Sequence, residues 1–284
     1  MIDRIQKIQG WKIHHQEQLL YRAKVGSPSI RLKFFHHPNY RQFVRVDKFP
    51  SHCKVKRKGI NTFFLFQQKV HTRGTISLDR VITVFPEPSL LNLENDWGKI
   101  SEIPTRLKSK YHESSKFWPI KSPAILNTSE DELFSTDDLS SWVKATFQYV
   151  RTKIKHRERQ DERLGAYQAL LTEIGDCDEF TDLFITLARV RGIPCRRLTG
   201  YFIQKQGKKV EAHAWGEIFS PKMRWITVDA ALNNLGNHTI NYVIQKIEQF
   251  NPALSDYQIK TKHSTVVQYE WDRPKPSVSP VYTP

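Results

Sequence analysis

Three residues in the second half of the chain, Cys177, His213 and Asp229, have the side chains and the order of a thiol catalytic centre. A thiol becomes an effective nucleophile when a neighbouring base takes its proton. That base works best when a third group fixes its orientation and balances its charge. The three residues therefore predict a cysteine-based site for acyl transfer, provided that the fold brings them together.

Cys177 stands at the start of a predicted helix in the stretch GDCDEFTDLFITLARVRGIP. Apolar residues at helical spacing form one stripe of this helix, and Cys177 belongs to the same stripe. The stripe consists of Phe180, Leu183, Phe184, Leu187 and Ala188. Gly192 and Pro194 mark the end of the helix. The amides and the dipole at a helix N-terminus favour an anion, so a cysteine there is a better nucleophile.

Four carboxylates surround this cysteine, namely Asp176, Asp178, Glu179 and Asp182. Negative neighbours would oppose a thiolate if they lay against the sulfur. Helical spacing places Asp178, Glu179 and Asp182 away from the face of Cys177, so we expect them to point toward water. Acidic residues in the first turn also suit the positive end of the helix dipole.

His213 and Asp229 lie on two predicted strands, EAHAWGE and RWITVDA. Because side chains alternate along a strand, His213 shares one face with Trp215, and Asp229 shares one face with Trp225. If the strands pair through the turn FSPKMR, Asp229 can lie across from His213 and hold its imidazole.

Each of these residues also has a structural interpretation. A lone cysteine on an apolar stripe is usually a core residue, and a histidine on a half-buried strand usually packs there. The shared order and parity of the three residues favour the catalytic interpretation. Cys195 is predicted to be a small core residue and Cys53 to be incidental. Without a CxxC pair, neither a metal site nor a disulfide framework is expected, and a reducing, cytoplasmic location is the simplest prediction.

The rest of the chain predicts the elements that position the site. Residues 15–86 contain short β-rich runs separated by turn signals, which predict an antiparallel sandwich. The predicted division is a basic β-sandwich domain over residues 1–90, a connector over 91–135, a catalytic core over 136–272 and a Pro-rich, disordered tail over 273–284. One short helix is expected within RLKSKYHESS of the connector. Thr136 is expected to cap the next helix.

The positive charge of the chain is concentrated in its N-terminal part. Residues 1–120 hold 22 Lys/Arg and 9 Asp/Glu, a net charge of +13, whereas the whole chain carries +15. Such a surface either binds an anionic partner or simply keeps the protein in solution. No nucleic-acid motif accompanies it, so no nucleic acid is expected. No apolar run is long enough to span a membrane, and the N-terminus lacks the features of a secretory signal.

The blocks GDCDEFTDLFITLARVRGIPCRRLTGYF, HAWGEIF and WITVDAA resemble the transglutaminase-like superfamily over residues 137–232. These are papain-like α+β thiol enzymes, and bacterial members, some of them cysteine proteases, often carry an N-terminal β-sandwich. The resemblance implies Cys177 as nucleophile, His213 as base and Asp229 as the orienting acid. It implies the Cys177 amide as one oxyanion donor, with Tyr149 or Gln168 as the second. It also implies Trp215 as the aromatic residue after the histidine, where it either forms a wall of the site or packs in the core.

This chain departs from two branches of the family. It has no CxxC zinc module of the kind found in peptide N-glycanases, and it is far shorter than the animal transglutaminases. No calcium loop is recognisable in the sequence, and no cofactor is expected.

Three functions remain open at this point. The first is hydrolysis of an amide in a protein or peptide, possibly an acidic one, through a thioester acyl-enzyme. The second is transglutamination, in which a lysine amine replaces water. The third is a non-catalytic binding module built on the same fold.

Overall fold

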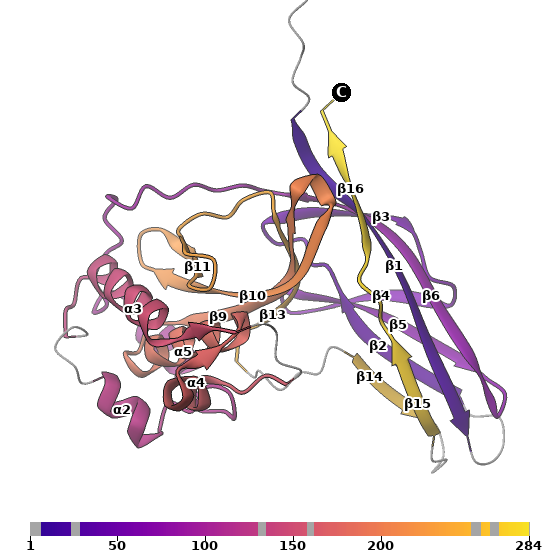
Figure 1. The fold of residues 1–284 in the computed structure, drawn as a ribbon, viewed down its shortest axis with the longest axis horizontal. Helices are drawn as coiled ribbons and strands as arrows, with labels where there is room; N and C mark the ends of the chain where they lie inside the picture. The colour runs from indigo at the N-terminus through magenta and orange to yellow at the C-terminus, as the bar shows by residue number, and fades with distance from the viewer. Residues whose placement is uncertain are drawn as a thin grey trace, which may run out of the picture.

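The fold is that of a computed structural model, which describes residues 7–23, 29–129, 135–157, 162–250, 257–261 and 267–283. It combines a β-sandwich with a second half in which helices pack on an antiparallel sheet (Figure 1). This confirms the predicted α+β class with an N-terminal β-sandwich.

The β-sandwich is built from two antiparallel sheets. Its N-terminal strands are β1 (Ile8–Ala23), β2 (Ser29–His36), β3 (Gln42–Lys48), β4 (Cys53–Lys58), β5 (Asn61–Lys69) and β6 (Arg73–Pro86). One sheet has the order β15-β1-β6-β3, with β16 also paired to β1, and the other has the order β14-β2-β5-β4. Leu19, Leu32, Phe64 and Leu78 lie in the core between them. Alternation of buried and exposed residues along β1 gives the sheet its inner face.

The C-terminal residues complete this sandwich. The strands β14 (Tyr257–Thr261), β15 (Val267–Asp272) and β16 (Ser277–Tyr282) join β2 or β1. The strand β15, which falls within the predicted catalytic core of residues 136–272, thus pairs with β1 of the sandwich. The prediction of a disordered tail is wrong, because β16 pairs antiparallel with β1. Its Pro280 is compatible with a strand since β16 has a neighbour on one side only.

The second half contains a sheet of order β12-β11-β10-β9-β13. Its strands are β9 (Cys195–Gln204), β10 (Lys209–Ser220), β11 (Arg224–Asp229), β12 (Asn234–Leu235) and β13 (Tyr242–Glu248). The helix α5 (Cys177–Val190) packs on β9 and β10, with α3 (Leu139–Lys153) and α4 (Ala166–Thr172) against its other sides. A short parallel pair, β7 (Lys155–His156) and β8 (Ile174–Gly175), leads into α5.

The predicted connector is part of this half. The expected helix is present as α1 (Thr105–Tyr111), and a further helix, α2 (Pro123–Ser129), follows it. Trp97 and Trp118 are fully buried in the core around α5. Residues 130–134 of the predicted connector lie outside the described residues. The division of the chain at residues 90, 135 and 272 stays a prediction.

The cap of α3 differs from the predicted one. Asp138, rather than Thr136, is the N-cap, and its carboxylate accepts a hydrogen bond of 2.7 Å from the Ser141 amide. The Thr136 hydroxyl accepts a hydrogen bond from the Asp138 amide one step earlier. Aspartate and threonine are both good caps, so composition alone did not decide between them.

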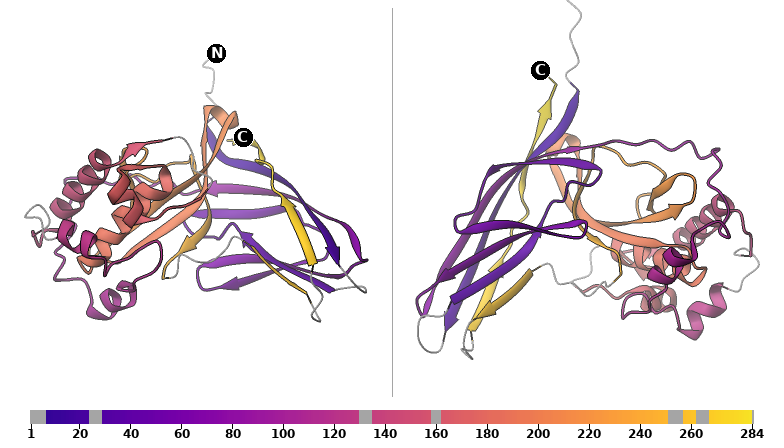
Figure 2. Two further views of the ribbon diagram at one scale, coloured as in Figure 1. Left: turned by 60° about the horizontal axis from the view of Figure 1, so that its bottom comes forward. Right: turned by 180° about the vertical axis from the view of Figure 1, so that it is seen from behind.

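The two halves share apolar and polar contacts. Trp11, Ile82 and Val84 of the sandwich form one buried cluster with Ile203 and Val243 of the second sheet. The strands β2 and β6 also contact β13 at this junction between the two halves, which Figure 2 shows in two further views. Asn61 exchanges two hydrogen bonds with the backbone of Ile247, of 2.8 and 2.9 Å. The sandwich therefore supports the sheet that carries the site.

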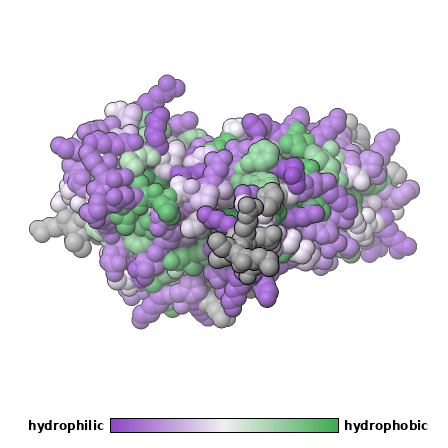
Figure 3. Space-filling view, turned by 90° about the horizontal axis from the view of Figure 1, so that it is seen from above, coloured by the Kyte–Doolittle hydropathy of each residue, from purple (hydrophilic) through white to green (hydrophobic). Residues whose placement is uncertain are grey.

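Hydrophilic side chains cover most of the face seen in Figure 3, with separate hydrophobic patches over both halves. Among the helices of the described residues, none has both the length and the hydrophobicity needed to cross a bilayer.

The close approach of β13 to β9 generates a prediction about Gly200. A Cβ at Gly200 would lie 1.9 Å from the Val243 carbonyl oxygen, so Gly200→Ala must separate the two strands. We expect a loss of more than about 2 kcal/mol in the free energy of unfolding, measured by urea denaturation. Gly216→Ala on β10 is the matched control, because its Cβ would meet the Val228 carbonyl at an ordinary 3.4 Å. Equal stability of the two variants would contradict this prediction.

Candidate active site

Cys177 is the first residue of α5 and is half-buried. A capping box fixes this helix end. The Asp176 carboxylate accepts from the Asp178 amide at 2.9 Å, and the Glu179 carboxylate accepts from the Asp176 amide at 3.1 Å. The Cys177 amide belongs to the first turn, where helical amides have no acceptor within the helix.

The expectation that Glu179 and Asp182 point toward water is wrong, because both side chains are fully buried. Glu179 accepts a further hydrogen bond of 2.8 Å from the Leu164 amide. Burial raises the pKa of Glu179 to about 7, against the effect of the amides that it binds. Asp182 accepts from the Trp118 indole at 2.8 Å and from Arg163 Nε at 2.7 Å. Burial also raises the pKa of Asp182, and Arg163 opposes that shift.

Asp178 is paired with a buried arginine. Its carboxylate forms an ion pair with Arg197, and Arg197 also bonds Glu248 at 3.1 Å. Glu248 in turn pairs with Lys246 at 2.6 Å and with Arg163 at 3.1 Å. The carboxylates near the cysteine are thus matched by cations or by helix amides. Asp178 and Asp182 are paired with arginines, and Asp176 and Glu179 accept hydrogen bonds from amides, which weakens the objection to a thiolate at Cys177.

His213 lies between Asp229 and Cys177. Its Nε2 is 2.7 Å from Asp229 Oδ2, and the Cys177 side chain is close enough to the ring to raise the pKa of the histidine. Because Nε2 faces the carboxylate, Nδ1 is the nitrogen left for the sulfur. Burial acts to lower the pKa of His213, but Asp229 and Cys177 outweigh burial and raise it to about 10. The environment of His213 therefore favours an imidazolium.

The strand register explains how the histidine and the aspartate meet. Pairing of β10 with β11 ends at Gly216 and Val228. His213 lies three residues beyond this pair and Asp229 lies one residue beyond it, so both side chains occupy the same face of the sheet. The sequence predicted this shared face. The structure adds that Asp229 reaches His213 diagonally.

Tyr242 is a site residue that the sequence did not indicate. Its hydroxyl donates to Asp229 Oδ2 at 2.7 Å and accepts from Asn234 Nδ2 at 2.9 Å. The Leu232 amide donates to Asp229 Oδ1 at 3.0 Å, so both carboxylate oxygens are engaged. Burial and Asp229 raise the pKa of Tyr242, which keeps its hydroxyl protonated. Nothing in the sequence showed that β13 would lie beside β9 at this point.

The structure also places the other three predicted site residues, Trp215, Tyr149 and Gln168. The Trp215 indole is fully buried and stacks on His213 with ring centroids 5.9 Å apart and an interplanar angle of 17°. It thus packs in the core and also covers one face of the imidazole. Tyr149 is half-buried on α3, packed against the core, and Gln168 is exposed on α4. A role for either as second oxyanion donor stays a prediction.

One group of possible metal ligands surrounds the cysteine. The side-chain ligand atoms of Asp176, Cys177 and Asp178 lie within 4.8 Å of one another. The Asp176 carboxylate caps the helix, however, and the Asp178 carboxylate is paired with Arg197. A cation would have to compete with both contacts, so these residues fit a metal poorly.

The comparisons with known proteins concern the family and the fold. Residues 127–230 match the family model of the transglutaminase-like superfamily, which confirms the resemblance seen in the sequence. The matched segment contains Cys177, His213 and Asp229. A comparison with curated proteins finds no match.

A solved structure resembles this chain over nearly its whole length. A protein described as a "putative cysteine protease" from Cytophaga hutchinsonii aligns over 98% of this chain and 99% of its own, with a TM-score of 0.62 and 15% identity. This likeness shows that both halves form a known arrangement. A "putative protease" from Parabacteroides distasonis and a protein described as a TGase align less well. Their TM-scores are 0.31 and 0.26, at 9% and 18% identity, and they cover 81% and 67% of this chain and 47% and 46% of their own.

The buried network beside the cysteine generates a stability prediction. Arg197→Ala leaves Asp178 and Glu248 without their shared cation, and Glu248 is almost fully buried. We expect the free energy of unfolding to fall by about 3–5 kcal/mol in urea denaturation. Lys209→Ala, which removes the exposed pair with Glu211, should cost at most about 1 kcal/mol. A similar small loss in both variants would show that the network is not a stabilising unit.

The shifted histidine generates a prediction about pH. A raised pKa means that folded protein binds a proton that the unfolded chain has lost, so His213 stabilises the fold below about pH 6.5. This contribution is lost as the pH rises toward 10. We therefore expect the free energy of unfolding of the wild type to fall more steeply than that of His213→Gln across this window. The measurement is urea denaturation of both proteins at several pH values. If their free energies of unfolding change in parallel with pH, the assignment of an imidazolium at His213 is contradicted.

Proposed function

We propose that the chain is a cysteine-dependent enzyme that cleaves an amide through a thioester acyl-enzyme, with Cys177, His213 and Asp229 as its triad. One observation carries this proposal. The imidazole of His213 is held by the 2.7 Å contact with Asp229 on one side and meets the Cys177 sulfur on the other. This is the relation between nucleophile, base and orienting acid that thiol catalysis needs.

The reaction follows from these contacts. The Cys177 sulfur, its proton held by His213, attacks the amide carbonyl and forms a tetrahedral intermediate. His213 then donates the proton to the amide nitrogen as the carbon–nitrogen bond breaks, which releases the amine and leaves a thioester. A water molecule next loses a proton to His213 and attacks the thioester carbonyl. The proton returns to the sulfur as the acid leaves.

Asp229 and Tyr242 position the base in this scheme. Asp229 stabilises the imidazolium and fixes which nitrogen faces the sulfur. Tyr242 and the Leu232 amide hold the carboxylate in place. The Cys177 amide in the first turn of α5 is the natural donor to the oxyanion, because the intermediate forms directly at that helix end.

The match to the transglutaminase-like superfamily and the fold shared with a "putative cysteine protease" support an enzyme of this chemistry. They also support a protein or peptide as substrate. Water is the proposed acceptor of the acyl group, and a primary amine would make the same enzyme a transglutaminase.

The acyl-enzyme is the species to detect. We expect the wild type, incubated with a panel of activated acyl esters and peptide amides, to gain the mass of one acyl group at Cys177. Cys177→Ala should lose both the adduct and the turnover, with a rate at least about 10³-fold lower. Cys53→Ala is the control, because Cys53 lies on β4 of the sandwich.

Two outcomes decide the proposal. An adduct that persists in Cys177→Ala, or turnover unchanged by that substitution, would overturn the assignment of the nucleophile. Adding a primary amine tests the acceptor: products that carry the amine in place of a free acid would assign transamidation.

A further inference from the structure

The outer face of the sheet β14-β2-β5-β4 is strongly basic. Alternation along each strand places every second residue on this face, and the register aligns the cations across strands. Lys260 lies beside Arg31, and Lys33 and Lys54 both lie beside Leu65 on β5. Lys56 and Lys58 continue the row on β4.

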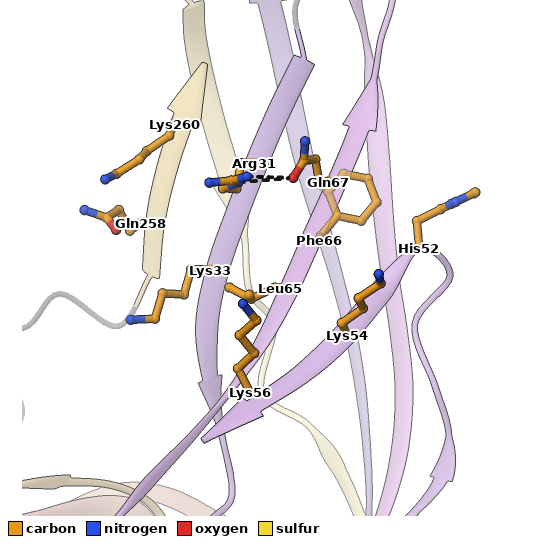
Figure 4. Close-up of a pocket in the computed structure, with 10 residues that line it drawn as sticks. All are labelled: Arg31, Lys33, His52, Lys54, Lys56, Leu65, Phe66, Gln67, Gln258 and Lys260. Atoms are coloured by element: carbon orange, nitrogen blue, oxygen red, sulfur yellow. Dashed lines mark hydrogen bonds between the residues drawn. The ribbon is translucent and has the colours of Figure 1, made fainter. Parts of the chain in front are cut away.

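These cations line a hollow of about 640 Å³ (Figure 4). Its lining contains no carboxylate among the described residues. Arg31, Lys33, His52, Lys54, Lys56, Leu65, Phe66, Gln67, Gln258 and Lys260 line it. The hollow lies in the sandwich, away from the cysteine, so it is distinct from the candidate active site.

The charges of this face are not neutralised within the part of the chain that the structure describes. Arg31 donates to the Gln67 amide oxygen at 2.9 Å, and the Lys33 ammonium lies 3.8 Å from the centre of the Phe63 ring. Burial together with Lys58 and Lys260 lowers the pKa of Lys33, as expected for cations that repel one another. By contrast, Lys48 on the other sheet pairs with Asp79 at 2.7 Å.

Protection of a sheet edge does not explain this pattern. Lysines on an edge strand discourage unwanted pairing, and β4 is an edge strand. Arg31 and Lys33, however, lie on β2, which has β14 and β5 as neighbours. A row of like charges across an interior strand repels itself, so it stabilises the protein only when an anion binds.

We propose that this basic face docks an acidic, extended segment of a protein substrate. Alternate residues on a strand are about 6.7 Å apart, and an extended peptide with acidic side chains at alternate positions repeats at the same distance. Such a segment can place its carboxylates on Arg31 and Lys33, or on Lys54 and Lys56, at once. Gln67 and Gln258 add amide donors between the cations.

The composition of the face favours a polypeptide over other polyanions. Proteins that bind single-stranded nucleic acid without sequence preference offer exposed aromatic rings on which bases stack. Here Phe63 and Phe66 are buried, and among the described residues that line the hollow only His52 offers an exposed ring, so a row of stacking rings is missing. Attachment to an anionic membrane is favoured by apolar side chains that protrude among the cations. Leu65, the other apolar residue of the hollow, is half-buried beneath them.

The basic face also adjoins the half of the molecule that carries the site. Phe35 lies two residues beyond Lys33 on the same face of β2. The centre of its ring is 5.3 Å from the Lys246 ammonium on β13. Lys246 pairs with Glu248, and Glu248 bonds Arg197, the partner of Asp178 beside the cysteine. Calling the bound segment part of a substrate rests on the proposed function, whereas the binding itself does not.

The test uses the full chain and a fluorescein-labelled peptide of ten alternating glutamates and threonines. Its affinity is measured by fluorescence anisotropy at low and at high salt. We expect binding that weakens as salt is raised, and that weakens at least about tenfold in Lys33→Glu/Lys56→Glu/Lys260→Glu. Lys99→Glu/Lys110→Glu/Lys121→Glu, three exposed lysines of the second half, carries the same change in net charge and should bind within about threefold of the wild type.

Each outcome decides the proposal. Equal binding by the two triple variants would overturn it, since the effect would then be one of net charge. Tighter binding of a ten-nucleotide RNA or of phosphatidylserine vesicles by the same face would also overturn it, in favour of that partner. The peptide should bind Cys177→Ala as it binds the wild type, so a failure of the proposed enzyme would leave this measurement intact. Thermal unfolding of both triple variants is measured as a control that they are folded.

Discussion

The hydrogen bond between His213 and Asp229 is the interaction on which the site depends. Both side chains are nearly or fully buried, and a buried charge is costly unless it is paired. The fold meets this requirement by placing the two residues on one face of β10 and β11, and by engaging both oxygens of the carboxylate through Tyr242 and the Leu232 amide. The imidazole is then held against the cysteine at the start of α5. Without the sheet register, neither the pairing nor the contact with the sulfur could form.

The same constraint explains the charged groups around the cysteine. Carboxylates at the N-terminus of α5 would oppose a thiolate if they were unpaired, yet each accepts a hydrogen bond from a backbone amide or pairs with an arginine. Arg163 and Arg197 reach these groups from outside the helix, and Glu248 of β13 connects the two arginines. The sandwich contributes from further away, because it packs on β9 and β13 and supports the sheet. Both halves of the molecule thus contribute to one polar arrangement.

Much of this architecture could be predicted from the sequence. The apolar stripe and the Gly192 stop located α5, and strand parity placed His213 and Asp229 on a common face. Apart from the local choice of Asp138 over Thr136 as the cap of α3, the failures share one cause, which is that long-range pairing leaves little local signal. Glu179 and Asp182 were expected in water because their partners, Leu164 and Arg163, lie on a separate segment. Tyr242 was missed because the position of β13 depends on strand order. The Pro-rich tail was expected to be disordered because its own sequence gives no sign that β16 pairs with β1, which lies at the opposite end of the chain.

The central claim is that Cys177 and His213 act as a pair, and selective alkylation tests it most directly. The three cysteines of the folded protein are alkylated with iodoacetamide at a series of pH values, and each site is followed by mass spectrometry. Burial raises the pKa of Cys53 to about 11 and that of Cys195 to about 12, so both should react slowly near neutral pH. The account predicts fast modification of Cys177 near pH 7, and its loss in His213→Ala. Modification of Cys177 no faster than that of Cys53, or unchanged by His213→Ala, would contradict it.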